Sequence, residues 1–178
     1  MGGMYETDTE FDDLQRLLDA SLGRSTEHLR SIVKPGERTL SARQLAGVLT
    51  GMCTLSAATV TAKGEPRISG VDGHFLHGRW VFGTDGTAAK TRHLRARPAV
   101  SVAHIRGDDL GVFTHGTVEF LPQDHPDWPE IDAHLIRHYG NSPTTWGENI
   151  VYMRVVPHWM VAYAADPAKM LDQAGIST

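Results

Sequence analysis

The sequence is short of several residue types, and each shortage excludes a class of protein. Cys53 is the single cysteine among 178 residues, which excludes a disulfide framework and a cysteine-based zinc site and is typical of a reducing compartment. No apolar run approaches the roughly 20 residues that a membrane-spanning helix needs. Residues 1–11 are acidic, whereas a secretory signal peptide is basic and then apolar. We therefore expect a cytoplasmic protein with no membrane partner.

Negative charge is absent from one long stretch. Residues 86–107 contain no acidic residue but five basic ones, so they hold +5 and the rest of the chain −9, which together give the net charge of −4. Such a segment suggests a bound anion, although a solvated helix face gives the same pattern. It lacks interleaved aromatics and any recognised motif, so we expect no nucleic-acid partner. The basic residues are Lys90, Arg92, Arg95, Arg97 and Arg106, of which Arg95 and Arg97 are expected to be solvated.

The beginning of the chain predicts helices. Apolar residues recur at helical spacing over 11–18, and a second short helix fits 27–33. Ser41, with Gln44 three residues later, is typical of a capping box that starts a third helix. We interpret residues 1–40 as an N-terminal helical extension that packs on the main domain or on a partner subunit.

After Gly51 the pattern changes to strands separated by tight turns, which include Lys63-Gly64 and His77-Gly78. Pro157 is expected to break the last strand region into two. Many short antiparallel strands with one helix among them predict a mainly β (α+β) closed barrel over 41–166, followed by a tail over 167–178. The predicted strands are 52–62, 67–75, 79–84, 99–105, 112–121, 150–156 and 159–163, and the predicted helices are 87–97, 126–139 and 167–173.

Residues 84–92 are the strongest candidate for a functional site. A strand is predicted to end at Thr84, and a helix is predicted to begin near Thr87, where free backbone N–H groups and the helix dipole favour an anion. Lys90 falls in the first turn, where a cation opposes the dipole unless an anion is bound there. A phosphate held by Lys90, Thr84 and Arg92 would satisfy this arrangement. In the alternative, Thr87 only caps the helix and Asp85 neutralises Lys90.

The same segment carries a family resemblance. Residues 80–104 read WVFGTDGTAAKTRHLRARPAVSVAH, and residues 55–67 read LSAATVTAKGEPR. The order of strand, Gly/Thr turn, Lys-x-Arg-x-Leu and Arg-Pro-x-Val-Ser-Val resembles the pyridoxamine 5′-phosphate oxidase-like group, also called flavin/deazaflavin oxidoreductases. The second stretch is similar to that family's first hairpin. The resemblance covers 41–121, with a weaker similarity at 151–163, and implies a split antiparallel β-barrel of the FMN-binding type with peripheral helices.

The resemblance also implies a homodimer with two cofactor sites at the subunit interface. The implied phosphate site is the start of the 87–97 helix, in agreement with one of the two readings from charge. The candidate cofactor-binding residues are Arg67 and Ser69 facing the cofactor, Gly83 and Thr84 against its ring or ribityl chain, Lys90 and Thr91 at its phosphate, and Arg92 as a second cation.

The chain departs from the oxidases of this family at three places. Asp72 stands where a second basic residue is expected, Gly111 stands where a glutamine contacts the isoalloxazine, and residues 159–166 lack the substrate-binding Arg and His. We therefore do not expect oxidation of pyridoxamine phosphate.

Three functions remain open. The first is an FMN-binding oxidoreductase that acts on an unidentified small-molecule redox substrate. The second is a reductase that uses the deazaflavin coenzyme F420. The third is a non-enzymatic flavin or haem carrier or sensor. In the first two the cofactor carries the redox chemistry, and the protein supplies position and electrostatics.

Histidine and aromatic residues are the remaining candidates for binding a metal, a haem or a flavin. His134 and His138 have i, i+4 spacing, but no carboxylate lies between them as in metallohydrolases, so we expect surface histidines and no metal site. His104, His115 and His158 are the candidates for an axial haem ligand. Cys53 and Trp80 are expected in the core, Trp146 is expected to be protected in an ordered loop over 140–148, and Trp146 and Trp159 are candidates to stack on a flavin.

Overall fold

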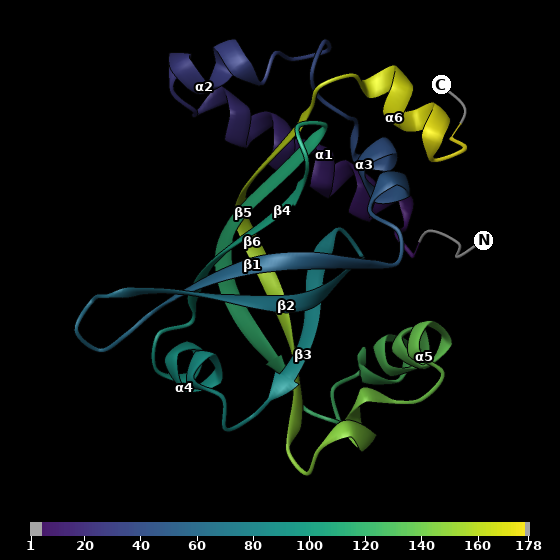
Figure 1. Cartoon of the computed structure of the whole chain (residues 1–178). Coiled ribbons are helices and arrows are strands. Elements are labelled where there is room, and N and C mark those ends of the chain that lie inside the picture. The colour runs from purple at the N-terminus through teal and green to yellow at the C-terminus, as the bar shows by residue number, and fades with distance from the viewer. Residues whose placement is uncertain (1–4, 177–178) are drawn as a thin grey trace.

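Six strands close into an antiparallel barrel in the order β1-β2-β3-β6-β5-β4, which confirms the predicted architecture. In Figure 1, the helices from the two ends of the chain lie above the barrel, and two helices from the middle of the chain lie below it. The computed structural model describes residues 5–176, so the outer ends of the predicted extension and tail, 1–4 and 177–178, lie outside it. The elements are α1 (Asp8–Gly23), α2 (Glu27–Ile32), α3 (Ala42–Val48), β1 (Met52–Val60), β2 (Pro66–Leu76), β3 (Arg79–Asp85), α4 (Ala89–Ala96), β4 (Ala99–Arg106), β5 (Leu110–Leu121), α5 (Trp128–Tyr139), the 3-10 helix η1 (Pro143–Trp146), β6 (Ile150–Ala164) and α6 (Pro167–Gln173).

The two hairpin turns differ in length. His77 and Gly78 join β2 to β3 and both have positive φ, 54° and 69°, as a two-residue type I′ turn requires. The two-residue turn predicted at Lys63-Gly64 is wrong, because the N–H of Thr61 donates to the carbonyl of Glu65 at 2.9 Å and leaves a three-residue loop. Such loops place a left-handed residue last, and Gly64 has φ 81°.

Strand β6 runs through Pro157 without a break, so the prediction of two separate strands is wrong. Proline cannot donate a ladder hydrogen bond, and sheets accept it at edges or bulges. The register between β5 and β6 shifts between His115 and Gly116, and Gly116 is paired with Pro157. A Cβ on Gly116 would lie 2.3 Å from the carbonyl oxygen of Val156. A bulge built around glycine therefore lets β6 continue.

The N-terminal helix shares the core of the barrel. Phe11 and Leu14 of α1 belong to the same buried cluster as Trp80 and Met160, and α1 packs against β6. The backbone N–H of Met160 donates to the hydroxyl of Ser21 at 3.0 Å. Helix α1, which lies in the region interpreted as an N-terminal extension, therefore packs on the barrel. None of the helices described over 5–176 is long and apolar enough to cross a bilayer.

Helix α5 covers the outer face of β2, β3 and β6. Leu76, Val81 and Tyr152 of these strands form a second buried cluster with Ile131 and Leu135 of α5. The helix begins at Trp128, two residues later than predicted.

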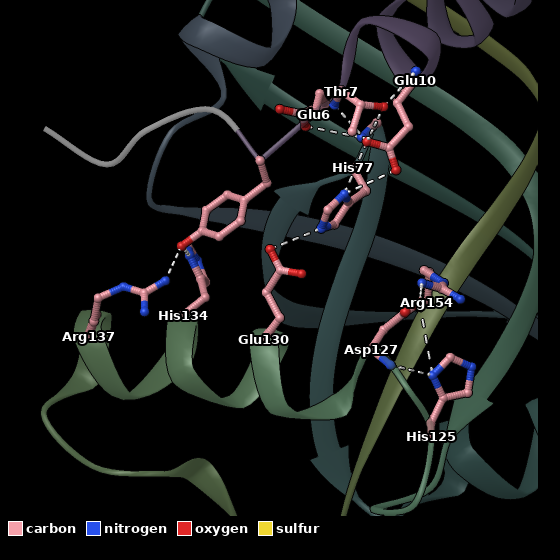
Figure 2. Close-up of polar contacts among 12 residues, drawn as sticks. Glu6, Thr7, Glu10, His77, His125, Asp127, Glu130, His134, Arg137 and Arg154 are labelled. Atoms are coloured by element: carbon pink, nitrogen blue, oxygen red, sulfur yellow. Dashed lines mark hydrogen bonds and ion pairs between the residues drawn. The ribbon is translucent and has the colours of Figure 1, made fainter.

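A buried ion pair ties the loop before α5 to the sheet. Arg154 is 8% exposed and donates to Glu119 at 2.8 Å and to Asp127 at 2.5 Å. This network holds the start of α5 against β6, and Figure 2 shows its Arg154 and Asp127 beside His125. Hydrogen bonds from Arg154 lower the pKa of Asp127 against the opposing effect of burial.

Replacing Gly116 tests the bulge. Gly116→Ala is expected to lower the free energy of unfolding by about 1–3 kcal/mol, because the backbone must move away from the new methyl group. The matched control is Gly70→Ala, a strand position where an added Cβ meets nothing within 4 Å. Urea unfolding of both variants checks the difference, and equal midpoints would contradict the role given to Gly116.

Candidate functional site

The barrel splits where β2 and β3 stop pairing. Their ladder covers Gly73–Leu76 and Arg79–Phe82 only. Beyond it, β2 continues along β1 and β3 continues along β6. Within the described chain, the facing edges of Gly70–Asp72 and Gly83–Thr84 have no strand partner. A cavity of about 230 Å³ lies against these edges, lined by Gly70, Val71, Asp72, Gly83, Thr84, Leu135, Tyr139, Pro143, Trp146 and Ile150.

Helix α4 begins just after β3, at the side of the split. Its first residue is Ala89, not Thr87 as predicted, because the carboxylate of Asp85 accepts the N–H of Thr87 at 2.6 Å and holds a turn there. Hydrogen bonds from the hydroxyl and the N–H of Thr87 lower the pKa of Asp85. The N-cap residue is Ala88, which makes no side-chain cap. The first N–H groups of α4 are therefore available to a ligand.

Lys90 stands at this uncapped helix start without a carboxylate partner among the described residues. Its Nζ lies 3.4 Å from the hydroxyl of Thr84, and the side chain is half-buried. Asp85 does not neutralise it, because that carboxylate binds Thr87 instead. A half-buried cation beside free N–H groups favours an anion at this point.

The remaining polar residues of α4 hold the local backbone. Thr91 is fully buried and donates to the carbonyl of Asp85 at 2.8 Å. Arg92 donates to the carbonyl of Thr87 at 2.6 Å. Arg95 is exposed, as predicted, and Arg97 is half-buried. Both donate at 3.0 Å to backbone carbonyls, those of residues 86 and 60. Most of the basic segment therefore fixes the turn and the hairpin.

Arg67 and Ser69 lie outside the lining of the cavity. Arg67 is exposed near the tip of the hairpin, and its guanidinium pairs with Glu65 at 2.7 Å. Its cross-strand partner is Thr59, whose hydroxyl lies 3.0 Å from Nδ1 of His93 in α4. Because cross-strand partners point to the same face of a sheet, Arg67 lies on the α4 side of the hairpin. The structure thus groups Gly83, Thr84 and Lys90 but leaves Arg67 and Ser69 apart.

The wall opposite the strands comes from α5 and η1. The sequence offered Trp146 of η1 as a stacking candidate but did not indicate Tyr139 of α5. Tyr139 and Trp146 both line the cavity, and their rings meet edge to face at 4.9 Å between centroids. Trp146 is 53% exposed, so the expectation that its loop protects it is wrong. Its indole N–H donates to Asn141 at 3.0 Å. An exposed indole fixed at a cavity mouth is available to stack on a planar ligand.

The prediction of surface histidines holds for part of the set, because His28, His115, His138 and His158 are exposed, but not for His74 and His104, which are buried. His74 is 1% exposed, and its Nδ1 lies 2.9 Å from Nε2 of His134. Of the haem candidates, His115 lines an outer apolar cavity of about 740 Å³, where Trp159 also lies. His104 is buried next to Trp80. Within residues 5–176, no group of three or more His, Cys, Asp or Glu side chains is placed to hold a metal ion.

No family model and no curated protein matches the sequence. Solved structures do match. The heme storage protein HutZ of Vibrio cholerae is 16% identical with a TM-score of 0.58, covering 68% of this chain and 93% of that one. An F420 reductase is 22% identical with a TM-score of 0.52, covering 64% and 92%. An FAD-binding protein of Mesorhizobium loti is 21% identical with a TM-score of 0.56, covering 71% and 94%. The chain therefore has the split-barrel fold of the pyridoxamine 5′-phosphate oxidase-like proteins, as the sequence resemblance implies.

Proposed function

We propose that this protein binds a flavin-type cofactor, FMN or in its place the deazaflavin F420, and serves as an oxidoreductase. The observation that carries the proposal is Lys90, a half-buried cation without a carboxylate partner among the described residues, at the uncapped start of α4. Thr84, 3.4 Å from its Nζ, also lines the cavity of the split. An anion bound at Lys90 therefore adjoins a cavity that takes a planar ring.

The size of the cavity supports a ligand that is only partly enclosed. Pockets for whole small molecules start at about 300 Å³, whereas this cavity holds about 230 Å³. A ring system fits between the two strand edges, while the phosphate end lies outside at α4. The free backbone groups of both edges would pair with polar atoms of the ring, and the exposed Trp146 would cover one of its faces.

Each residue then has a chemical task. Lys90 and the N–H groups of residues 89–91 neutralise the phosphate, and Thr84 adds a hydroxyl donor. Arg92 holds the turn through Thr87 and brings a second positive charge. The bound cofactor supplies hydride or electron transfer. The protein orients the ring and limits the access of water, and a small-molecule substrate approaches the open side of the ring.

We also propose that the protein is a homodimer, as the family resemblance implies, through the outer face of β4, β5 and β6. This face holds the apolar cavity of about 740 Å³. Ile105 is 60% exposed and Phe113 is 39% exposed there. Burying such a surface is favourable by roughly 25 cal/mol for each Å² of apolar area. A second copy would cover these side chains on both protomers at once.

Haem binding is the second candidate function. His115 lines the same apolar cavity and stacks on Trp159 with 4.6 Å between the ring centroids. Its Nδ1 bonds to the hydroxyl of Ser101 at 2.8 Å, which leaves Nε2 for a ligand. Hemin titration followed at the Soret band, in the native protein and in His115→Ala, tests this candidate. A Soret shift that His115→Ala abolishes supports it, and no shift refutes it.

Replacing Lys90 tests the phosphate site. Lys90→Ala is expected to weaken FMN binding by roughly 1.5–3 kcal/mol, the worth of a charged hydrogen bond, and to leave riboflavin binding unchanged because riboflavin has no phosphate. Quenching of flavin fluorescence measures both, with F420 titrated in parallel. Lys169→Ala on α6 is the matched control. Equal loss for FMN and riboflavin, or no loss at all, would contradict the role of Lys90.

Replacing Phe113 tests the dimer. Sedimentation equilibrium of the native protein should give twice the chain mass of 19.5 kDa, and Phe113→Glu should give a monomer, because two charges would face each other in an apolar interface. Ile136→Glu, at an equally exposed apolar position on α5 (39%), is the control and should remain dimeric. A dimer that survives Phe113→Glu would remove this face from the interface.

A further inference from the structure

A chain of hydrogen bonds connects the N-terminal segment to the cavity of the split. The guanidinium of Arg137 donates to the phenol oxygen of Tyr5, which lies 2.9 Å from Nδ1 of His134. Nε2 of His134 lies 2.9 Å from Nδ1 of His74, and Nε2 of His74 lies 3.0 Å from the phenol oxygen of Tyr139. Figure 2 shows His134 and Arg137 side by side on α5, both directed toward the N-terminal segment. Tyr139 lines the cavity.

The positive charge of Arg137 determines which group donates and which accepts at each step of this chain of hydrogen bonds. Arginine can only donate, so the oxygen of Tyr5 accepts from it. The positive charge then favours the arrangement in which the O–H of Tyr5 points away, to Nδ1 of His134. A neutral imidazole carries one N–H, so His134 donates from Nε2 to His74, and His74 donates from Nε2 to Tyr139. The reverse direction would leave the O–H of Tyr5 without an acceptor among the described residues.

The side chains in this chain of hydrogen bonds keep the protonation states that this donor–acceptor direction requires. Burial, with His134 and His138 nearby, lowers the pKa of His74 to about 3. Burial and Arg137 lower the pKa of His134. Burial, together with the charge of Asp72, raises the pKa of Tyr139 to about 12. Both imidazoles are therefore neutral and the phenol is protonated at physiological pH.

At the cavity, Tyr139 accepts from His74 and its own hydrogen remains available. Asp72 lines the same cavity, and its carboxylate can only accept. The wall thus offers a donor and an acceptor near each other. A ring edge with a carbonyl beside an N–H, as in a cyclic imide, offers the complementary pair. Flavins and deazaflavins both carry such a pyrimidinedione edge.

We propose that Tyr139 is a fixed hydrogen-bond donor of the cavity, held in that role by the chain from Arg137 through Tyr5, His134 and His74, and that with Asp72 it selects ligands bearing an imide edge. This inference rests on the proposed function and deepens it. His74 and His134 are positioning residues, because they act on the ligand only through Tyr139. The selectivity follows from hydrogen-bond direction, since a site built to donate rejects a ligand that cannot accept.

Histidine tautomers test the direction of the chain without any ligand. Long-range ¹H–¹⁵N NMR on protein with ¹⁵N-labelled histidine should show the Nε2–H tautomer for both His74 and His134 at pH 7, assigned with His74→Asn and His134→Asn. The signals of His74 should remain those of a neutral ring as the pH falls from 8 to about 4, because its pKa is lowered to about 3. An Nδ1–H tautomer at His74, or a charged ring at pH 7, would overturn the inference.

Arg137 supplies the matched variants away from the cavity. Arg137→Lys retains a group that can only donate, so both tautomers should be unchanged. Arg137→Met removes the cation, so Tyr5 can accept from His134, and a fraction of Nδ1–H tautomer should appear. Tautomers that are the same in both variants would show that Arg137 does not set the direction.

Flavin binding tests the role of the donor. Tyr139→Phe should weaken riboflavin binding by roughly three- to tenfold, as expected for loss of a neutral hydrogen bond. Ser31→Ala, which removes an exposed hydroxyl of α2, is the control and should bind riboflavin as the native protein does. N3-methylriboflavin lacks the imide N–H and should bind the native protein more weakly than riboflavin. Equal affinity of Tyr139→Phe and the native protein for riboflavin would refute the inference.

The experiments distinguish failure of the proposed function from failure of this inference. If the native protein binds neither FMN, riboflavin nor F420, the proposed function fails, and the imide ligand fails with it. The tautomers then decide alone whether Tyr139 is a fixed donor. If the native protein binds FMN and loses it in Lys90→Ala but not in Tyr139→Phe, the proposed function stands and this inference is wrong.

Discussion

The site depends on one geometric constraint, the end of β2–β3 pairing at Gly73 and Phe82. From there each strand follows a different partner, so two edges of the barrel face a cavity instead of each other. Unpaired backbone groups must find other partners, and a ligand between the edges would provide them. Glycine at position 83 lets β3 approach Tyr152 closely, because a Cβ there would lie 3.2 Å from the Tyr152 ring. The split that opens the barrel therefore also forms the candidate site.

The parts that could be predicted from the sequence are those encoded within a few residues. The Ser41–Gln44 capping box, the type I′ turn at His77-Gly78 and the buried Trp80 follow from local chemistry. The proximity of Thr84 and Lys90 also follows from the local sequence, because only one short turn separates them. A barrel follows because short antiparallel strands joined by tight turns must bury one face and cover their edges.

The parts that could not be predicted depend on which distant segments meet. Tyr139 and Trp146 reach β2 only because α5 packs across its outer face, and helical periodicity does not say which sheet a helix covers. His74 and His134 are 60 residues apart, so their contact left no pattern in the sequence. Pro157 predicted a break because it lacks an N–H, but Gly116, which faces the bulge in β6, lies on the neighbouring strand, and that pairing depends on the register.

Asp72 illustrates how a departure from a family pattern can acquire a meaning. Taken alone, an acid in place of a second basic residue weakens the case for a phosphate. The structure places Asp72 in the cavity wall with Tyr139, while Lys90 lies at the start of α4 beside Thr84. Like charges repel strongly where water is partly excluded. Under the proposed function, a ligand with an anionic end and a neutral ring can then enter in one orientation only, with its phosphate at Lys90 and its ring toward Asp72.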